Sequence, residues 1–438
     1  MRYSTILLVL LMPYATGNAW AQTNEKTNQS SLESEHQRAV ELARNDQHDA
    51  ALKILDNLLL QAPDNYPIRR DYVIIAAWKG DCDKSLKYYQ PIQNRPDQED
   101  YLILPVSECL ANTRQTDEAL NLLRKGTKAY PDNQDIKTSY QSLLNDIALD
   151  KKPELQITVG RGESDAGNQE HFLNVRYSQF LAEATRWFVR YYQTHADDKE
   201  FKTGDLNRVG VGIMHWFHPQ WYFEQEFSKE IRHDDPAGFT STLIHYPTSL
   251  WQVRAQYASF AEDIPLRAKA LDIESNRFTV GADYHSINYQ WEWSGSFSMY
   301  DFSDDNDRKS YYTSLGYAYE QKEKREQRVI GELYHSTNSQ NNVVYFNPES
   351  DVAITITHRT SFVLDTQYDR HVDHLSLFAG QYDQKNYQSE VIYGIRYEQE
   401  YDFNLYHSLN WGAEYASRVY DGERESELSF IVTLTSKL

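Results

Sequence analysis

Acidic side chains recur at alternate positions in the C-terminal two thirds of the chain, between aromatic and aliphatic residues. From Tyr289 to Met299 the odd positions are almost all large and apolar, while the even positions are Gln, Glu or Ser. A period of two places the polar residues on one face of a β-strand. The acidic residues predicted on such faces are Glu224, Glu226, Asp283, Glu292, Glu332, Asp365, Asp369, Glu398 and Glu414. Gathered around one enclosed space, they would favour neutral or cationic ligands.

Arginines on the same polar faces are fewer, namely Arg176, Arg190, Arg254, Arg277 and Arg396. The balance on these faces is therefore acidic, in line with a net charge of −20 for the whole chain. Such a charge disfavours nucleic acid as a partner, because phosphates are bound by basic patches. The alternative is that these carboxylates are merely solvated and impose no selectivity.

Catalytic and metal-binding patterns are weak in this sequence. His215 and His218 flank one predicted turn, and His371 and His374 flank another, but no third and fourth ligand follows at a recognisable spacing. The acidic loop 301–307 could bind calcium, although a solvated loop is the simpler interpretation. No nucleophile elbow, phosphate loop or nucleotide fingerprint is found. We expect no cofactor, no metal and no enzyme activity, although Ser, His and Asp from separate strands could still assemble in a barrel enzyme.

The elements that must position the acidic residues are β-strands. After Pro153 the chain is rich in Tyr, Trp, Phe, Ser and Gly, and we count about sixteen segments of period two up to Leu438. Bacterial outer-membrane barrels have an even number of strands and carry aromatic girdles at the strand ends. A mean hydropathy of −0.72 is compatible with such a barrel, because its inner face is polar. We predict a 16-stranded antiparallel transmembrane β-barrel over residues 153–438.

The connections predicted between these strands alternate in length. If the preceding helices lie in the periplasm, the first strand runs outward and every odd-to-even connection is extracellular. The longer extracellular connections are predicted at 197–204, 261–275, 336–350 and 418–425. The twelfth strand is predicted to run from 351 to 371.

The front part of the chain has a helical period. Residues 32–149 contain apolar residues at helical spacing, which predicts short amphipathic helices in antiparallel pairs. The tetratricopeptide pattern is met by Ala51, Leu55 and Pro63 and again, 68 residues later, by Ala119, Leu123 and Pro131. We predict about three tetratricopeptide-like repeats, capped by a helix over 133–149. A generic helical bundle is the alternative.

Targeting and redox features indicate secretion. Residues 1–21 contain a basic residue, a short apolar run and an Ala19-Trp20-Ala21 ending, as in a cleavable signal peptide. No later stretch approaches the roughly 20 apolar residues that a membrane-spanning helix needs. Cys82 and Cys109 could form a disulfide in an oxidising compartment, although the sequence does not show whether they approach each other.

Five segments of the predicted barrel lie in or beside its extracellular loops. They are 264–268, 301–304, 344–348, 384–387 and 420–425. In order and spacing they resemble segments of the poly-β-1,6-N-acetyl-D-glucosamine export porin (PgaA) family. The loop residues that carry the resemblance are Arg267, Asp304, Tyr345, Phe346, Asn347, Pro348, Lys385, Asn386, Tyr387, Asp421, Gly422 and Arg424.

The resemblance implies a Gram-negative outer-membrane porin that exports a partly deacetylated, hence partly cationic, biofilm polysaccharide through an electronegative lumen. It also implies a periplasmic deacetylase or synthase complex as a partner of the helical repeats. Members of the family carry a longer tetratricopeptide superhelix, so we expect a shortened repeat domain here. We expect a monomer. The alternatives are a plugged outer-membrane receptor, adhesin or anchor, and an export porin for another glycan such as cellulose.

Overall fold

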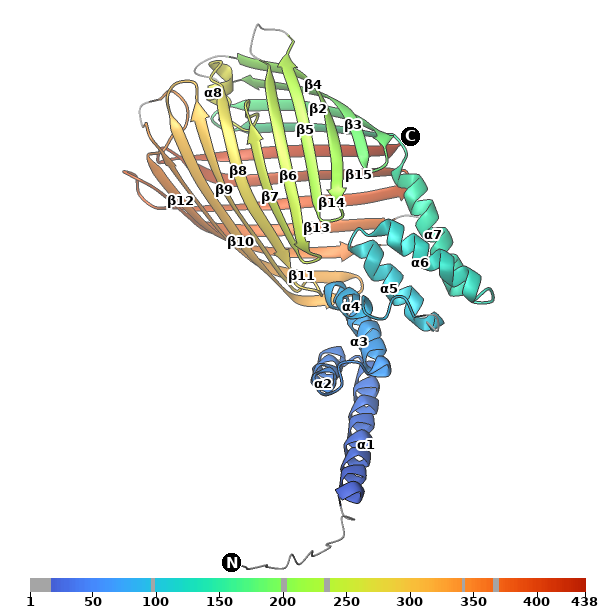
Figure 1. The fold of residues 1–438 in the computed structure, drawn as a ribbon. Helices are drawn as coiled ribbons and strands as arrows, with labels where there is room; N and C mark the ends of the chain where they lie inside the picture. The colour runs from blue at the N-terminus through green and yellow to red at the C-terminus, as the bar shows by residue number, and fades with distance from the viewer. Residues whose placement is uncertain (1–16, 96–98, 198–202, 232–236, 341–342, 365–369) are drawn as a thin grey trace, which may run out of the picture. The chain divides into compact units, whose positions relative to one another are not determined.

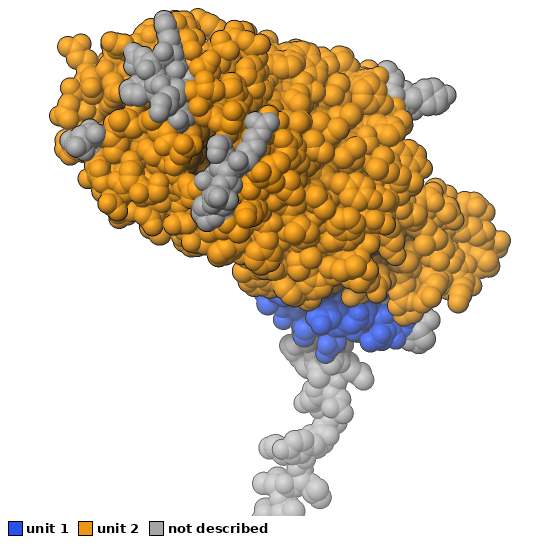
Figure 2. All heavy atoms as spheres, turned by 90° about the horizontal axis from the view of Figure 1, so that it is seen from above, with its two compact units in different colours: residues 1–110 blue, residues 111–438 orange. Residues whose placement is uncertain are grey.

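The computed structural model describes residues 17–95, 99–197, 203–231, 237–340, 343–364 and 370–438. The chain divides into two compact units, residues 1–110 and residues 111–438 (Figure 2). Most of the predicted signal peptide, residues 1–21, lies outside the described part, so that feature stays a prediction.

The first unit is helical. Its elements are α1 (Gly17–Arg44), α2 (His48–Gln61), α3 (Tyr66–Lys79), α4 (Cys82–Tyr89) and most of α5 (Asp100–Asn112). Ala51 and Leu55, which the repeat pattern places at helix contacts, are both completely buried. They pack in one core with Ala39, Ile68 and Tyr72. No helix in the described part of the chain is long and apolar enough to cross a membrane.

The two cysteines join neighbouring helices of this unit. Cys82 begins α4 and Cys109 lies near the end of α5, with their Cα atoms 4.9 Å apart. They form a disulfide that closes a sequence separation of 27 residues. Since both side chains are buried, the bond fixes the packing of α5 against the preceding helices.

Removal of this disulfide tests its contribution to the helical unit. We expect Cys82→Ser with Cys109→Ser to lower the unfolding free energy of the unit by about 3 kcal/mol, because the unfolded chain regains loop entropy. The measurement is urea unfolding of the full chain in detergent, followed by the helical circular dichroism signal. Reductant should shift the wild type to the same midpoint and leave the double variant unchanged. Equal midpoints for the oxidised wild type and the variant would contradict the expectation.

Two further helices belong to the second unit. They are α6 (Thr116–Ala129) and α7 (Gln134–Asp150). The predicted capping helix over 133–149 coincides with α7, and Asn133 caps it by accepting a hydrogen bond from the Ile136 N–H (3.2 Å). Arg186, near the start of the strand Thr185–Asp197, donates to the backbone oxygens of Asp150 (3.1 Å) and Lys152 (3.0 Å). The boundary between the two compact units lies before α6. The number of tetratricopeptide-like repeats in 32–149 stays a prediction.

The rest of the second unit is a closed antiparallel barrel of sixteen strands (Figure 1), which confirms the predicted fold class. The strands are β1 (Glu154–Ser164), β2 (Gln169–Ala182), β3 (Thr185–Asp197), β4 (Thr203–His218), β5 (Trp221–Glu230), β6 (Gly238–Thr248), β7 (Trp251–Ala258), β8 (Ser275–His285), β9 (Trp291–Phe302), β10 (Asp307–Lys322), β11 (Arg325–Asn338), β12 (Ser350–Val363), β13 (Arg370–Gln384), β14 (Glu390–Asn404), β15 (His407–Tyr420) and β16 (Glu423–Lys437). Each strand pairs with its neighbours in the chain, and β1 pairs with β16.

Two predicted boundaries are wrong. The twelfth strand ends at Val363 rather than at 371, and the sequence misled because no Gly or Pro marks the connection from Leu364 onward. The predicted loop 418–425 is a two-residue turn of Asp421 and Gly422, whose φ angles are 51° and 79°. Positive φ at both positions is typical of a tight hairpin turn, for which Asp-Gly is a favoured sequence.

The barrel has an apolar outer face and a polar inner face. Alternate residues of β12 and β14, such as Ile354, Ile356, Val391 and Tyr393, are exposed large hydrophobic side chains. Exposed apolar side chains are expected where a strand faces lipid. The residues between them point to the interior of the barrel, and these inner positions carry the charged side chains.

Candidate functional site

The predicted acidic residues on the described strands lie on the inner face. Glu224 and Glu226 occupy β5, and Phe227, the next residue, is an exposed outer residue of the same strand. By the same alternation the inner face carries Asp283, Glu292, Glu332, Glu398 and Glu414. Asp365 and Asp369 lie outside the described residues.

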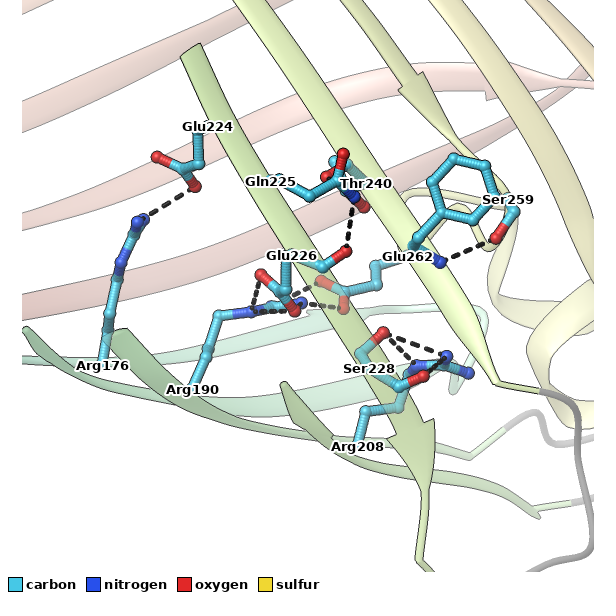
Figure 3. Close-up of polar contacts among 11 residues, drawn as sticks. Arg176, Arg190, Arg208, Glu224, Gln225, Glu226, Ser228, Thr240, Ser259 and Glu262 are labelled. Carbon is cyan, nitrogen blue, oxygen red and sulfur yellow. Dashed lines mark hydrogen bonds and ion pairs between the residues drawn. The ribbon is translucent and has the colours of Figure 1, made fainter. Parts of the chain in front are cut away.

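Arginines on strands two or three positions away in the barrel hold several of these carboxylates (Figure 3). Arg176 on β2 lies 3.0 Å from Glu224 on β5. Arg190 on β3 lies 2.8 Å from Glu226 and 2.6 Å from Glu262, which belongs to the connection after β7. Because Arg190 and Glu226 are largely buried, this pair forms part of the packed wall.

The same pairing recurs on the opposite wall. Glu414 on β15 forms ion pairs with Arg396 and, at 2.9 Å, with Arg418. Glu292 pairs with Arg328, and Glu398 has Arg359 at 3.9 Å. The sequence analysis missed several inner-face arginines, namely Arg208, Arg308, Arg328, Arg359 and Arg418. The available signal was that each lies an even number of residues from the inner-face residues of its own strand. Carboxylates that pair with these arginines, such as Glu326 and Glu427, were missed as well, so the acidic balance of the inner face stays a prediction.

Two predicted carboxylates form no ion pair among the described residues. Glu332 accepts hydrogen bonds from the hydroxyls of Tyr312 (2.9 Å), Thr355 (3.0 Å) and Thr357 (3.1 Å). Asp283 accepts one from Ser294 (2.7 Å). These hydroxyl partners orient the carboxylates without neutralising them, so their negative charge is available to a ligand.

A cavity of about 550 Å³ lies against the inner wall of β10 to β15. Its lining brings together Glu332, Glu398 and Glu414 with aromatic rings such as Tyr312 and Phe378. A volume of this size is within the roughly 300–1,000 Å³ of small-ligand pockets. The wall therefore offers carboxylates, guanidinium groups and apolar ring faces side by side.

The connection between β7 and β8 folds into the barrel. It spans 259–274 and contains α8 (Leu266–Ala270), which packs against β3 and β4. Glu262 pairs with Arg190 (2.6 Å), and Lys269 pairs with Glu170 on β2 (2.7 Å). Figure 1 shows α8 at the end of the barrel away from the C-terminus. The predicted loop residue Arg267 lies in α8.

This connection packs on the end of one strand and on one other loop. Ala261, Ile264 and Ala268 form a buried apolar cluster with Phe302 and Tyr345. These two aromatic residues come from β9 and from the β11–β12 connection. The β7–β8 connection, the end of β9 and the β11–β12 connection are thus joined by one small apolar core at the same end of the barrel.

Polar contacts complete the loop assembly. The Asn306 amide donates to the Tyr345 hydroxyl (3.0 Å) and to the Asn347 side chain (2.9 Å). Burial raises the pKa of the Tyr345 phenol to about 12, so the neutral hydroxyl donates to Asp304 (3.3 Å). The Pro348 carbonyl accepts from Asn338 (2.6 Å).

The remaining loop residues cluster at the adjacent strands. The Gln384 and Asp421 residues exchange hydrogen bonds of 2.7 and 3.0 Å. Phe346 packs edge-on against Tyr420, and Lys385 pairs with Glu349.

A Cβ at Gly422 would lie 2.6 Å from the Tyr387 ring, so this turn requires glycine. Asn386 has a positive φ of 75° in the β13–β14 connection, whereas Arg424 lies in β16 rather than in a loop and pairs with Glu390 (3.0 Å).

The histidine pairs weighed in the sequence do not converge. His371 contacts Asp373 (2.9 Å), while His374, on the opposite face of β13, contacts Ser361 (2.7 Å). His215 contacts Thr185 (2.8 Å), and the Gln220 N–H donates to His218 (3.3 Å). In the described ranges, no three His, Cys, Asp or Glu side chains are grouped to hold a metal ion.

Comparisons with known proteins match the barrel. The chain is 22% identical over 277 residues to the "Poly-beta-1,6-N-acetyl-D-glucosamine export protein" of Escherichia coli (strain K12), covering 60% of this chain and 33% of that protein. The protein of the same name from Escherichia coli O157:H7 gives the same values. The chain thus spans about a third of the length of these curated relatives.

A solved structure shares the fold. The "Bacterial polysaccharide outer membrane secretin" superposes with a TM-score of 0.61 at 20% identity, covering 66% of this chain and 99% of that one. Residues 149–438 match the family described as the PgaA membrane beta barrel domain. This match spans the whole sixteen-stranded barrel, so the chain belongs to the PgaA family of outer-membrane β-barrels.

Proposed function

We propose that this chain is a porin through which poly-β-1,6-N-acetyl-D-glucosamine, partly deacetylated, leaves the cell. The observation that carries the proposal is the match of residues 149–438 to the PgaA barrel family. The relatives named as exporters of this polymer support the choice of glycan. Export is passive: no bond is made or broken, and an inner-membrane synthase supplies the driving force.

The chemistry of the wall suits a polymer that carries many hydroxyls and some ammonium groups. Ion-paired side chains that stay partly exposed, such as Arg359 and Glu398, keep free hydrogen-bonding capacity. Glu332 and Asp283 add negative charge without a cationic neighbour in the described part of the chain. We infer that deacetylated sugars interact with these two carboxylates, and acetylated sugars with the paired residues.

The helical repeats supply a surface for periplasmic partners in this proposal. Repeat domains of this kind bind proteins or polymers, and a deacetylase or a synthase complex is the partner that the export route requires. The barrel itself is a monomer, because a closed sheet has no unpaired edge.

A plugged receptor or anchor is the second candidate. The observation that favours it is the connection 259–274, which lies inside the barrel and pairs with Glu170 and Arg190 on the wall. A fixed plug would block conduction and leave the loops as a binding face. If the connection 259–274 can move out of the lumen, it acts as a gate instead of a fixed plug.

The export proposal is tested in a deletion strain. We expect deletion to abolish surface poly-N-acetylglucosamine. Complementation with Asp283→Asn plus Glu332→Gln should give about fivefold less surface polymer than complementation with wild type, because about 1 kcal/mol of attraction between wall and polymer is lost. The measurement is a lectin or antibody blot of surface polymer, normalised to the barrel in the outer membrane.

The matched control changes two carboxylates on the outer face, Glu163→Gln with Asp205→Asn, and should secrete as the wild type does. Unchanged polymer on deletion would overturn export of this glycan. Full secretion by the inner-face variant would overturn only the role of the two carboxylates.

The gate is tested by conductance in planar bilayers. The ion pairs of Glu262 and Lys269 with the wall contribute about 1 kcal/mol together, so Glu262→Gln with Lys269→Gln should increase the open population by about fivefold. The control is Glu349→Gln with Lys385→Gln, which removes an ion pair between outer loops. Silence of both the wild type and the gate variant would favour the plugged receptor.

A further inference from the structure

Three aromatic side chains share the inner face at the end of the barrel where the C-terminus lies. Trp216 is near the end of β4, Tyr222 near the start of β5 and Tyr246 near the end of β6. The ring centroids of Trp216 and Tyr222 are 5.1 Å apart, and those of Trp216 and Tyr246 are 5.8 Å apart at an interplanar angle of 25°. The three rings form one continuous apolar surface, here called the aromatic platform.

Lipid contact does not explain the platform. The outer face at this end has its own aromatic residues, including Phe217, which is 65% exposed, and Trp221, which is 38% exposed. Interfacial girdles consist of such outward rings. The platform residues alternate with them along β4 and β5, in the same phase as Glu224 and Glu226, and therefore face the polar interior.

A flat polar group already lies on the platform. The guanidinium of Arg114, at the turn between α5 and α6, is 3.6 Å from the Tyr246 ring centroid and 5.7 Å from that of Trp216. Arg114 itself has a left-handed backbone conformation in this turn, with a φ of 64°. Within the described residues Arg114 forms no ion pair, and its guanidinium makes cation–π contacts with the rings of Tyr246 and Trp216.

The platform continues into the charged wall. The Tyr222 hydroxyl donates to Glu224 (2.6 Å), and Glu224 pairs with Arg176 at 3.0 Å (Figure 3). A ligand on the rings therefore has a carboxylate and a guanidinium beside it. Ring faces flanked by a few convergent polar groups are the usual composition of a small-ligand site.

We propose that Trp216, Tyr222 and Tyr246 are a pyranose-binding platform at the entrance of the barrel. A pyranose ring has an apolar C–H face that stacks on an aromatic ring and a rim of hydroxyls that requires donors and acceptors. The sugar takes the place of the Arg114 guanidinium on Tyr246, while Glu224 and Arg176 bind its hydroxyls. The identity of the glycan rests on the proposed function, whereas the platform itself requires only a pyranose chain.

The test is the affinity of the full chain for soluble oligosaccharides, measured by titration calorimetry in a detergent without a sugar headgroup. The probes are a pentasaccharide of β-1,6-linked N-acetylglucosamine and cellopentaose. Loss of two stacking rings in Trp216→Leu with Tyr246→Leu should weaken binding about tenfold. The matched control, Trp251→Leu with Tyr257→Leu, removes two exposed rings from the outer face of β7 and should bind as the wild type does.

The outcomes separate the platform from the export proposal. Weaker binding in the platform variant alone supports the platform. Binding of cellopentaose but not of the N-acetylglucosamine probe, with the same loss in the variant, supports the platform and counts against the proposed polymer. Equal affinity in wild type and platform variant, or no binding of either probe to the wild type, overturns the platform and leaves the deletion experiment to decide on export.

Arg114 provides a second measurement, through a substitution outside the barrel strands. Arg114→Ala uncovers the face of Tyr246 and should raise the affinity for the bound probe by roughly two- to fivefold, the equivalent of one exposed cation–π contact. A fall in affinity would overturn the claim that sugar and guanidinium occupy the same place. A folded barrel in every variant is checked by its heat-modifiable migration on gels.

Discussion

Closure of the sheet between β1 and β16 is the constraint on which the rest of the barrel depends. In lipid every backbone N–H and C=O must be paired within the protein, which an open sheet cannot achieve at its edges. Here Glu154 to Ser164 pair with Lys437 to Glu427 without a register shift. The Leu438 N–H extends this seam by donating to the Pro153 carbonyl (2.8 Å). Closure then fixes which residues face lipid, since the side-chain period of two is kept along the paired strands apart from register shifts near five turns.

The fixed inner face explains why charges appear in pairs. Long inner side chains reach across one or two intervening strands to form ion pairs, and a carboxylate beside a low-dielectric wall is stabilised by a guanidinium. Arg176, Arg190 and Arg328 each contact carboxylates on other strands or loops. The lumen therefore combines both signs of charge at short spacing, and its negative potential depends on carboxylates that have no cationic partner in the described part of the chain, such as Glu332.

The period of two in the sequence predicted the barrel, because the two faces of each strand meet different surroundings and alternate residues therefore differ in polarity. The strand count, the inner position of the described acidic residues and the helix over 133–149 all follow from local period. The ion pairs of Glu292 with Arg328 and of Glu398 with Arg359 could not be predicted, because each joins two strands that are not consecutive in the chain. The inward fold of 259–274 could not be predicted, since Glu262 and Lys269 meet strands that are far away in sequence. The Cys82–Cys109 bond depends equally on tertiary packing.

The barrel wall and the connection inside it differ in how they are held. The wall is a continuous hydrogen-bonded ladder, so its local opening would break many bonds at once. The connection 259–274 is held by two ion pairs and by an apolar cluster of small residues with Phe302 and Tyr345. Segments with few buried apolar contacts open at lower free energy than core strands. Movement at this end is therefore confined to the loops, while the aromatic platform at the other end, built on β4, β5 and β6, keeps a fixed geometry for an incoming chain.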